Sequence, residues 1–335
     1  MILFNFNIFI IDTLFSKMNE GKQININQKK GLKFFNKRII LTIKIILTLF
    51  LFYKTIYNNQ KFIEKLSFDF MNINNYKETI KLSEGGLLEI FENKDKTIEI
   101  DTKNGKIYKS EILFLSVPGG SYRKLGKPER LPIAKRLFFM GYSSAILLYS
   151  IYPEGYPTNY NQGLQAIKIL SSRFKKIILI GFSAGGHLTG LLGTTERSKL
   201  YNTIGMILCY PVISFYKNAH ENSRKNFFGD RYENNEENQK LFSIENRVNS
   251  NTLPTFIWTI KNDKIVPYEN TLYMIEKLKE NNVLFESKIF EKGRHGMALA
   301  DKTAIRYGIK EYKNKEVAKW LGLAINFVEN IIKNN

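Results

Sequence analysis

Short runs of apolar and β-branched residues alternate with segments of helical periodicity from about residue 85 onward. Such alternation is typical of a mostly parallel β-sheet that is covered by helices. The first two runs are short and polar, so we expect them to form an antiparallel edge. Predicted strands cover residues 87–91, 97–100, 111–117, 143–148, 176–180, 205–210, 255–260 and 284–290, and predicted helices cover about 130–140, 160–174, 184–192, 267–280 and 314–332.

One segment, residues 216–252, departs from this alternation. It is rich in Asn, Glu, Lys and Arg and shows little apolar periodicity between two predicted strands. Ligands of open parallel sheets bind beyond the carboxyl ends of the strands, so an insertion there would shape access to a site. We interpret the segment as a small cap, with a solvated surface excursion as the alternative.

The most apolar stretch of the chain, residues 39–53, follows a cluster of basic residues near the amino terminus. Extended to residue 57, it approaches the length of a membrane-spanning helix, although Lys44 in its middle opposes insertion. No small-residue cleavage site follows, which favours an uncleaved signal anchor over a removed signal peptide. Positive charge on its amino-terminal side would keep that side cytoplasmic and export the rest. The alternative is an amphipathic or buried helix in a cytoplasmic protein.

The composition is that of a globular protein with a substantial core. Of 335 residues, 44% are hydrophobic and 24% are charged, which argues against disorder and against a polytopic membrane protein. We divide the chain into a basic amino-terminal segment, 1–60, and a globular domain, 61–335. The formal net charge of +19 would suit nucleic acid, but the basic residues are dispersed and lack a basic-aromatic motif. We therefore expect no nucleic-acid partner.

Disulfide and metal chemistry have little support in the sequence. The single cysteine, Cys209, lies in an apolar run, which excludes an intrachain disulfide and a multi-cysteine metal site. The 3 histidines are scattered and form no set of metal ligands. We expect no metal and no cofactor.

The run Gly181-Phe182-Ser183-Ala184-Gly185 fits the pattern Gly-x-Ser-x-Gly. The pattern alone recurs by chance, but here it follows an apolar strand directly and opens onto a predicted helix. A nucleophile elbow needs this context, because its glycines let the backbone crowd together while the serine oxygen projects above the sheet. Ser183 is therefore the candidate nucleophile, and the alternative is a tight glycine turn with an incidental serine.

A serine hydroxyl needs a base, and the three histidines differ in context. His187 lies on the helix after Ser183, where packing behind the elbow is the simpler interpretation. His220 lies in the polar insertion, and we interpret it as a surface histidine. His295 follows the last predicted strand in a loop bracketed by glycines, which would carry its imidazole over the strand ends. His295 is the candidate base.

The base needs a carboxylate to fix its tautomer and to stabilise the imidazolium. Asp263, in the loop after the seventh predicted strand, is the candidate. The order Ser183, Asp263, His295 is that of α/β-hydrolases and differs from the orders in chymotrypsin and subtilisin. Asp301 and Asp230 are the alternatives, and Asp263 would also suit a helix cap.

Backbone amides must also stabilise the oxyanion of a tetrahedral intermediate. The run 117–122, Val-Pro-Gly-Gly-Ser-Tyr, follows a predicted strand and offers bare amides where the oxyanion loop of such a fold lies. We expect the amides of Gly119, Gly120, Ser121 and Ala184 to form the oxyanion hole. In isolation the run would be only a turn.

Together these motifs resemble the α/β-hydrolases that include acetyl-xylan and feruloyl esterase-like enzymes and related small carboxylesterases. The resemblance spans about residues 110–332 and implies an α/β-hydrolase fold. It implies Ser183 as nucleophile, His295 as base and Asp263 as its orienting acid. It also implies deacylation of ester-substituted sugars or small acyl esters without a cofactor. The resemblance rests on the runs 118–122, 149–153, 181–188, 210–213, 262–267 and 290–296, and on Glu129.

The chain departs from the family pattern at Ser121, where the oxyanion loop usually has a third glycine. A serine amide can still donate a hydrogen bond, but the Cβ restricts the backbone. We therefore expect a narrow acyl pocket that favours acetyl over larger groups.

The sequence thus predicts a membrane-anchored or secreted serine esterase for short-acyl esters, most of all acetyl esters of carbohydrates. Three other functions stay open. A serine peptidase of the prolyl-oligopeptidase type shares the fold and the elbow, although its usual propeller would need more than the roughly 110 residues that precede this domain. The others are a lipid-ester hydrolase at the bilayer and a non-catalytic hydrolase-like binding protein, which the complete triad disfavours.

Overall fold

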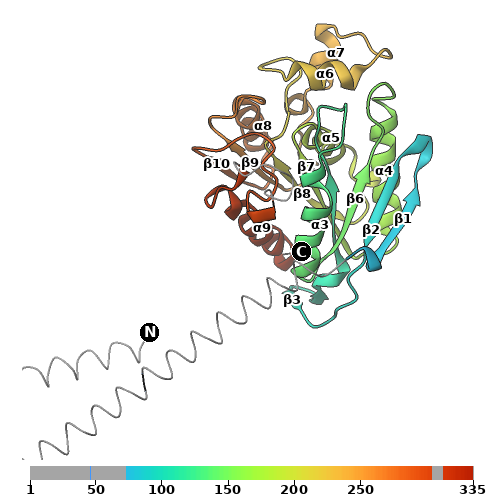
Figure 1. The fold of residues 1–335 in the computed structure, drawn as a ribbon, viewed down its shortest axis with the longest axis vertical. Helices are drawn as coiled ribbons and strands as arrows, with labels where there is room; N and C mark the ends of the chain where they lie inside the picture. Colours follow the sequence, from blue (N-terminus) through green and yellow to red (C-terminus); the bar gives the residue numbers. More distant parts are fainter. Residues whose placement is uncertain (1–45, 47–72, 304–311, 335) are drawn as a thin grey trace, which may run out of the picture. The chain divides into compact units, whose positions relative to one another are not determined.

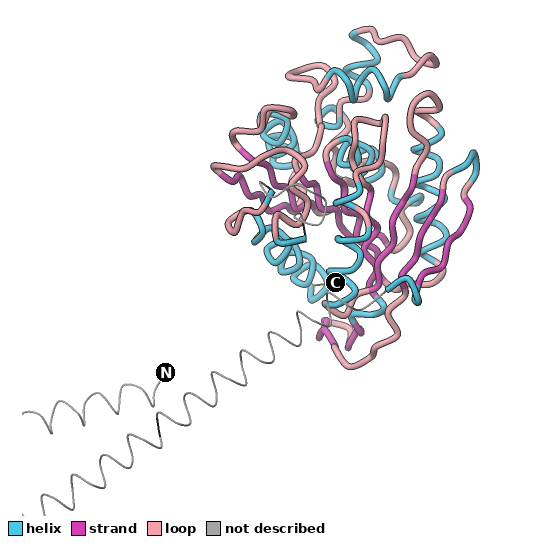
Figure 2. Tube along the Cα trace, in the orientation of Figure 1, coloured by secondary structure: helices cyan, strands magenta, loops and turns pink. Residues whose placement is uncertain are grey.

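A computed structural model describes Ile46 and residues 73–303 and 312–334. The chain divides into two units, Met1–Met71 and Asn72–Asn335, and the architecture below is that of the second. Figures 1 and 2 show the helices and strands of this unit.

The predictions for the amino-terminal region fall almost entirely on residues that the structure does not describe. The predicted anchor, 39–57, lies outside the described residues except for Ile46, and so does the boundary near residue 60. In the part of the chain that is described, no helix has the length and apolar character needed to cross a membrane. The anchor and the membrane localisation therefore stay predictions.

An eight-stranded sheet forms the centre of the domain. β2 runs antiparallel to both of its neighbours, and the other neighbouring pairs are parallel. The sheet is therefore mostly parallel, as predicted. In spatial order its strands are β1 (Lys77–Lys81), β2 (Leu87–Phe91), β6 (Ser143–Leu148), β5 (Ile112–Val117), β7 (Lys176–Phe182), β8 (Thr203–Cys209), β9 (Thr255–Ile260) and β10 (Phe285–Phe290).

The chain reverses its direction across the sheet at β5. From β5 it moves to β6 on one side, and it then returns to β7 on the other side of β5. Ligands of open α/β sheets bind beyond the carboxyl ends of the strands at such a switch point. Because Ser183 follows β7 and the predicted oxyanion loop follows β5, the topology brings both to this point.

Helices cover both faces of the sheet (Figure 1). The core on one face includes side chains of α4 (Thr158–Ser171), α5 (Ala184–Gly193) and α8 (Glu269–Glu280). The core on the other face includes side chains of α3 (Leu131–Phe139) and α9 (Trp320–Asn334). Successive residues of a strand point to opposite faces, so β5, which is buried on both, is apolar at nearly every position.

Two strand predictions need correction. We expected 87–91 and 97–100 to form an antiparallel edge, but β2 lies inside the sheet between β1 and β6. The second run is shifted to β3 (Glu99–Thr102), which pairs with β4 (Gly105–Tyr108) in a separate hairpin. The edge strand is β1, which the sequence does not predict because its Lys-Glu-Thr-Ile-Lys is largely exposed and has one apolar residue.

The segment 216–252, which we call the cap below, packs several of its residues against the domain. It contains α6 (Glu221–Phe228) and α7 (Glu236–Leu241), which lie together at one end of the domain in Figure 1. Phe227 and Phe242 from this segment are buried in the same core as α4 and α5. Phe228 and Ile244 are buried as well, whereas Leu241 is exposed, and the many polar residues obscure this pattern in the sequence.

Candidate active site

Ser183 lies at the sharp turn between β7 and α5, with a φ of 52° and a ψ of −119°. A positive φ is unfavourable for a residue with a Cβ, and such strain is concentrated at functional sites. The flanking glycines allow the turn. A Cβ on Gly185 would overlap backbone carbonyls at the end of β5, and one on Gly181 would overlap Thr189. This is the geometry of a nucleophile elbow.

His295 and Asp263, from the loops after β10 and β9, form a hydrogen-bonded chain with Ser183. His295 Nε2 lies 2.8 Å from Ser183 Oγ, and His295 Nδ1 lies 2.7 Å from Asp263 Oδ2. With the ring proton on Nδ1, the imidazole donates to Asp263 and accepts from the Ser183 hydroxyl. Asp263 Oδ1 accepts from the amides of Ile265 and Val266, at 2.8 and 3.1 Å. Asp263 is therefore both the partner of the imidazole and a turn-forming residue.

The alternative acids lie elsewhere. Asp301 pairs with Arg136 at 2.5 Å, and Asp230 is an exposed residue of the cap. Within the residues that the structure describes, neither carboxylate bonds to His295. The arrangement therefore favours Asp263 among the three predicted acids.

The other two histidines have different surroundings. His187 is fully buried behind the elbow, where Nδ1 accepts from the Tyr122 hydroxyl at 2.9 Å and Nε2 donates to the Phe242 carbonyl at 2.8 Å. Burial lowers the pKa of His187 to about 3, so its ring is neutral. His220, predicted as a surface histidine, is partly buried, and its Nδ1 lies 2.7 Å from the Ser223 hydroxyl. Burial lowers the pKa of His220.

The oxyanion loop corrects one of the four predicted donors and leaves the other three as predictions. The Gly119 amide donates to Glu129 Oε2 at 2.7 Å, so it is not available to an oxyanion, which corrects our prediction for Gly119. No acceptor among the described residues pairs with the amides of Gly120, Ser121 and Ala184. These three stay the predicted donors.

The backbone of this loop is held in an unfavourable conformation. Ser121 and Tyr122 have φ of 58° and 57°, in the left-handed region that favours glycine. The cap supports the loop, because Asn226 Nδ2 donates to the Ser121 carbonyl at 2.8 Å. The core supports it as well, through the bond from Tyr122 to His187.

Sequence reasoning missed the roles of Glu129 and Tyr210. The Tyr210 hydroxyl donates to Glu129 Oε1 at 2.8 Å, and the Tyr210 ring lies edge-on to His295 with centroids 5.0 Å apart. Both residues belong to the parts of the chain that carry the family resemblance. That resemblance is the one feature of the sequence that could have indicated a role for them. Nothing in the sequence indicates that they meet, because 81 positions separate them.

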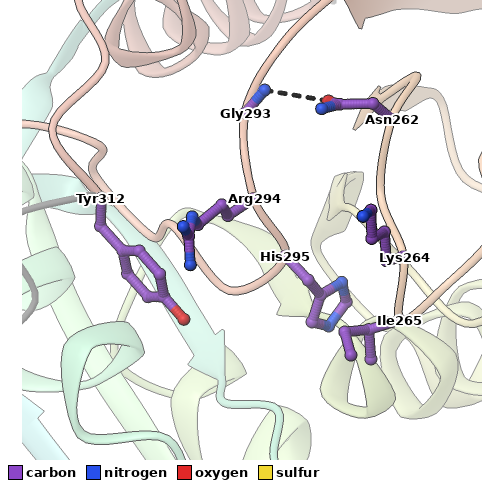
Figure 3. Close-up of a pocket in the computed structure, with 7 residues that line it drawn as sticks. All are labelled: Asn262, Lys264, Ile265, Gly293, Arg294, His295 and Tyr312. Atoms are coloured by element: carbon purple, nitrogen blue, oxygen red, sulfur yellow. Dashed lines mark hydrogen bonds between the residues drawn. The ribbon is translucent and has the colours of Figure 1, made fainter.

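A cavity of about 490 Å³ opens beside His295 (Figure 3). Figure 3 shows Lys264 and Ile265 on the same side of the cavity as the imidazole, with Arg294 and Tyr312 across from them. A general acid must reach the leaving group, so a cavity that His295 lines is suited to the leaving alcohol. The cavity is lined by Asn262, Lys264, Ile265, Gly293, Arg294, His295 and Tyr312.

The described residues offer little support for metal or cysteine chemistry. Over the described ranges, no group of three or more His, Cys, Asp or Glu is placed to hold a metal ion. Cys209 is a free, buried cysteine, and burial raises the pKa of its thiol, so it is held in the unreactive protonated form.

Comparisons with known proteins agree with the fold. Residues 165–319 match the prolyl oligopeptidase family. The acetyl ester-xyloside bifunctional hydrolase from Caldicellulosiruptor lactoaceticus has a similar structure, with a TM-score of 0.61 and 28% identity over 76% of this chain and 91% of that one. The chain has the α/β-hydrolase fold. The predicted fold class, with its mostly parallel sheet between helices, is thereby confirmed.

The chain is also similar to two curated proteins. It is 29% identical to endo-1,4-beta-xylanase B from Butyrivibrio fibrisolvens, over 56% of this chain and 33% of the relative. It is 27% identical to acetylxylan esterase from Xylanibacter ruminicola, over 55% of this chain and 40% of the relative. The chain thus spans between a third and two fifths of the curated relatives that it matches.

Proposed function

We propose that this α/β-hydrolase is a serine carboxylesterase for short-acyl esters, in the first place acetyl esters of carbohydrates. The chain of hydrogen bonds from Ser183 through His295 to Asp263, at 2.8 and 2.7 Å, carries the proposal. The similarity to proteins named for acetylxylan and acetyl ester-xyloside hydrolysis supports the choice of substrate.

The geometry supports a two-step reaction. Ser183 Oγ attacks the ester carbonyl carbon while His295 Nε2 takes the hydroxyl proton, and the carbonyl electron pair moves onto oxygen. The amides of Gly120, Ser121 and Ala184 surround the oxyanion. As the carbonyl re-forms, the bond to the alcohol breaks and His295 returns the proton to the leaving oxygen. Water then attacks the acyl-serine by the same steps and releases the acid.

The two ends of the substrate would meet different surroundings. The cavity beside His295 carries the donors Asn262, Lys264 and Arg294, which suit the hydroxyl-rich alcohol of a sugar ester. On the other side, Ser121 places a side chain where relatives usually have glycine, which supports a small acyl group.

A peptidase of the prolyl oligopeptidase type is the second candidate, because residues 165–319 match that family. The two activities share the nucleophile and the base and differ in the leaving group, which is an alcohol in one and an amine in the other. Proline-containing peptide amides and acyl esters therefore separate them.

The test uses the full chain and p-nitrophenyl esters from acetate to decanoate, followed by acetylated xylo-oligosaccharides. We expect kcat/KM to be highest for acetate and to fall with chain length, and we expect release of acetate from the sugar. Ser183→Ala is the control, and it should lower the turnover of every ester by at least about 10⁴-fold. Turnover of peptide amides but not of esters would favour the peptidase, and esterase activity that survives Ser183→Ala would contradict the proposal.

A further inference from the structure

Glu129 is a buried carboxylate that the reaction above does not use. It ends the 3-10 turn Lys127–Glu129 ahead of α3 and is 5% exposed. The Ser116 hydroxyl, on β5, donates to the Glu129 backbone carbonyl at 2.8 Å, which anchors the residue to the strand that leads into the oxyanion loop. Burial raises the pKa of Glu129, whereas the hydrogen bonds from Tyr210 and Gly119 lower it.

One oxygen of this carboxylate holds the oxyanion loop. Glu129 Oε2 accepts from the amide of Gly119, at 2.7 Å, and Gly119 directly precedes two of the predicted oxyanion donors. The Gly119 carbonyl in turn accepts from the amide of Gly126 at 2.8 Å. A Cβ on Gly126 would lie 2.6 Å from Glu129 Oε2, so the loop closes directly over the carboxylate. The orientation of the peptide units that lead to Gly120 therefore depends on this contact.

The other oxygen of the Glu129 carboxylate is connected to the loop that carries His295. Glu129 Oε1 accepts from the Tyr210 hydroxyl at 2.8 Å, and the Tyr210 oxygen accepts from the Ala298 amide at 3.1 Å. Ala298 belongs to the loop that carries His295. The Tyr210 ring also packs edge-on against the imidazole, with an interplanar angle of 68°. Tyr210 thus contacts both the ring of His295 and the backbone beyond it.

We propose that Glu129 is a positioning residue that fixes the oxyanion loop and the His295 loop relative to one another. Its two carboxylate oxygens connect the two loops through Gly119 and Tyr210, and both loops act on the same transition state. The inference rests on the proposed function, because it assigns Glu129 to the support of that same site. Glu129 touches neither the substrate nor the reacting atoms, so its contribution is to the alignment of groups that do.

Glu129→Gln tests the proposal with little change in volume. A glutamine side chain has one acceptor oxygen, so either Gly119 or Tyr210 loses its acceptor. Glu245→Gln is the matched control. Glu245 lies in the 3-10 turn Ile244–Asn246 of the cap, is 6% exposed, and has its pKa raised by burial as Glu129 does.

Two quantities should be measured for each full-length variant. The first is the second-order rate of Ser183 labelling by an alkyl fluorophosphonate. The second is kcat and KM for p-nitrophenyl acetate, with kcat expressed per labelled site so that unfolded protein does not contribute. For Glu129→Gln we expect both the labelling rate and kcat per site to fall about 10- to 100-fold, with KM within threefold, because misaligned oxyanion donors act in the transition state. For Glu245→Gln we expect both rates to stay within twofold.

Several outcomes would overturn the inference. A Glu129→Gln protein with rates within threefold of wild type per site would do so, and so would an equal loss in both variants. If Glu129→Gln does not fold, Tyr210→Phe is the variant that tests the proposal. It removes the hydroxyl that donates to Glu129 Oε1 and leaves the contact between Glu129 and the Gly119 amide intact. It should lower both rates about 10-fold, and unchanged rates would reject the proposal. If the wild type is labelled by the phosphonate but turns over no ester, the proposed function fails while the labelling rates still test Glu129.

Discussion

The two sides of Ser183 are built differently. On one side, His295 bonds to Asp263 through one ring nitrogen and to Ser183 through the other, and the His295 side chain is 13% exposed. On the other side, the loop after β5 has two residues at left-handed φ, and buried groups such as Glu129 hold it in place.

The histidines on the two sides show what the difference means. His295 and His187 each have both ring nitrogens engaged, but the partners differ. His295 lies between a carboxylate and a hydroxyl that can give up its proton, whereas His187 lies between a tyrosine hydroxyl and a backbone carbonyl. The first set of partners supports a charged ring during the reaction, and the second requires a neutral ring. Substitution of His295 should therefore affect mainly the rate, whereas substitution of His187 should affect mainly the stability.

The largest effect is expected for His295→Gln. The glutamine amide can still donate to Asp263, but it cannot take a proton from Ser183. We expect kcat for p-nitrophenyl acetate to fall at least about 10⁴-fold. The free energy of unfolding, measured in urea, should change by less than about 1 kcal/mol, because the side chain is partly exposed. A variant that keeps more than a hundredth of wild-type kcat would show that His295 is not the base.

On the oxyanion side, His187→Gln should act on stability. It disturbs two buried hydrogen bonds, so we expect the free energy of unfolding at pH 7 to fall by about 2–3 kcal/mol. We expect kcat per labelled site to fall less than tenfold. A loss of rate as large as that of His295→Gln, with unchanged stability, would erase the distinction between the two sides.

The pH dependence of stability sharpens the comparison. The pKa of His187 is about 3 in the folded protein, against 6.5 for an unperturbed histidine. As the pH falls below 6.5, the unfolded chain takes up a proton at this position that the folded protein does not, so the wild type loses roughly 1.4 kcal/mol per pH unit until about pH 3. His187→Gln lacks this loss, so its stability deficit should shrink between pH 6.5 and 4. If the difference in free energy of unfolding between wild type and His187→Gln stays constant from pH 6.5 to 4, the His187 ring is not held neutral in the folded protein.

The smallest effect is expected for Ser121→Gly. Glycine adopts a φ of 58° without the steric cost that serine has, so we expect the free energy of unfolding to rise by about 0.5 kcal/mol. Removal of the side chain should also widen the acyl pocket. The ratio of kcat/KM for butyrate to that for acetate should rise several-fold, and an unchanged ratio would remove Ser121 as the limit on acyl length.

The sequence predicts the elements that are encoded locally. The strands at 87–91, 143–148 and 255–260 are found with the predicted bounds, because each is a short apolar run between polar turns. The edge strand β1 escapes prediction because it is exposed, and its pairing with β2 depends on tertiary contacts. The packing of the cap escapes for a similar reason, since its buried apolar residues find their partners in the core of the domain.

In the candidate site, too, some features can be predicted from the sequence and others depend on tertiary contacts. The elbow, Asp263 and His295 are recognisable because the type and order of residues indicate their chemistry. The engagement of the Gly119 amide could not be predicted, because its acceptor is a side chain from the turn before α3.

The most direct test of the account is to identify the covalent intermediate. Wild-type protein would be mixed with p-nitrophenyl acetate and quenched in acid during turnover, and the acylated peptide would be mapped by mass spectrometry. The account predicts one acetyl group on Ser183, absent from Ser183→Ala, whose turnover is also lost. An acetyl group on another residue during turnover, or full turnover by Ser183→Ala, would contradict it.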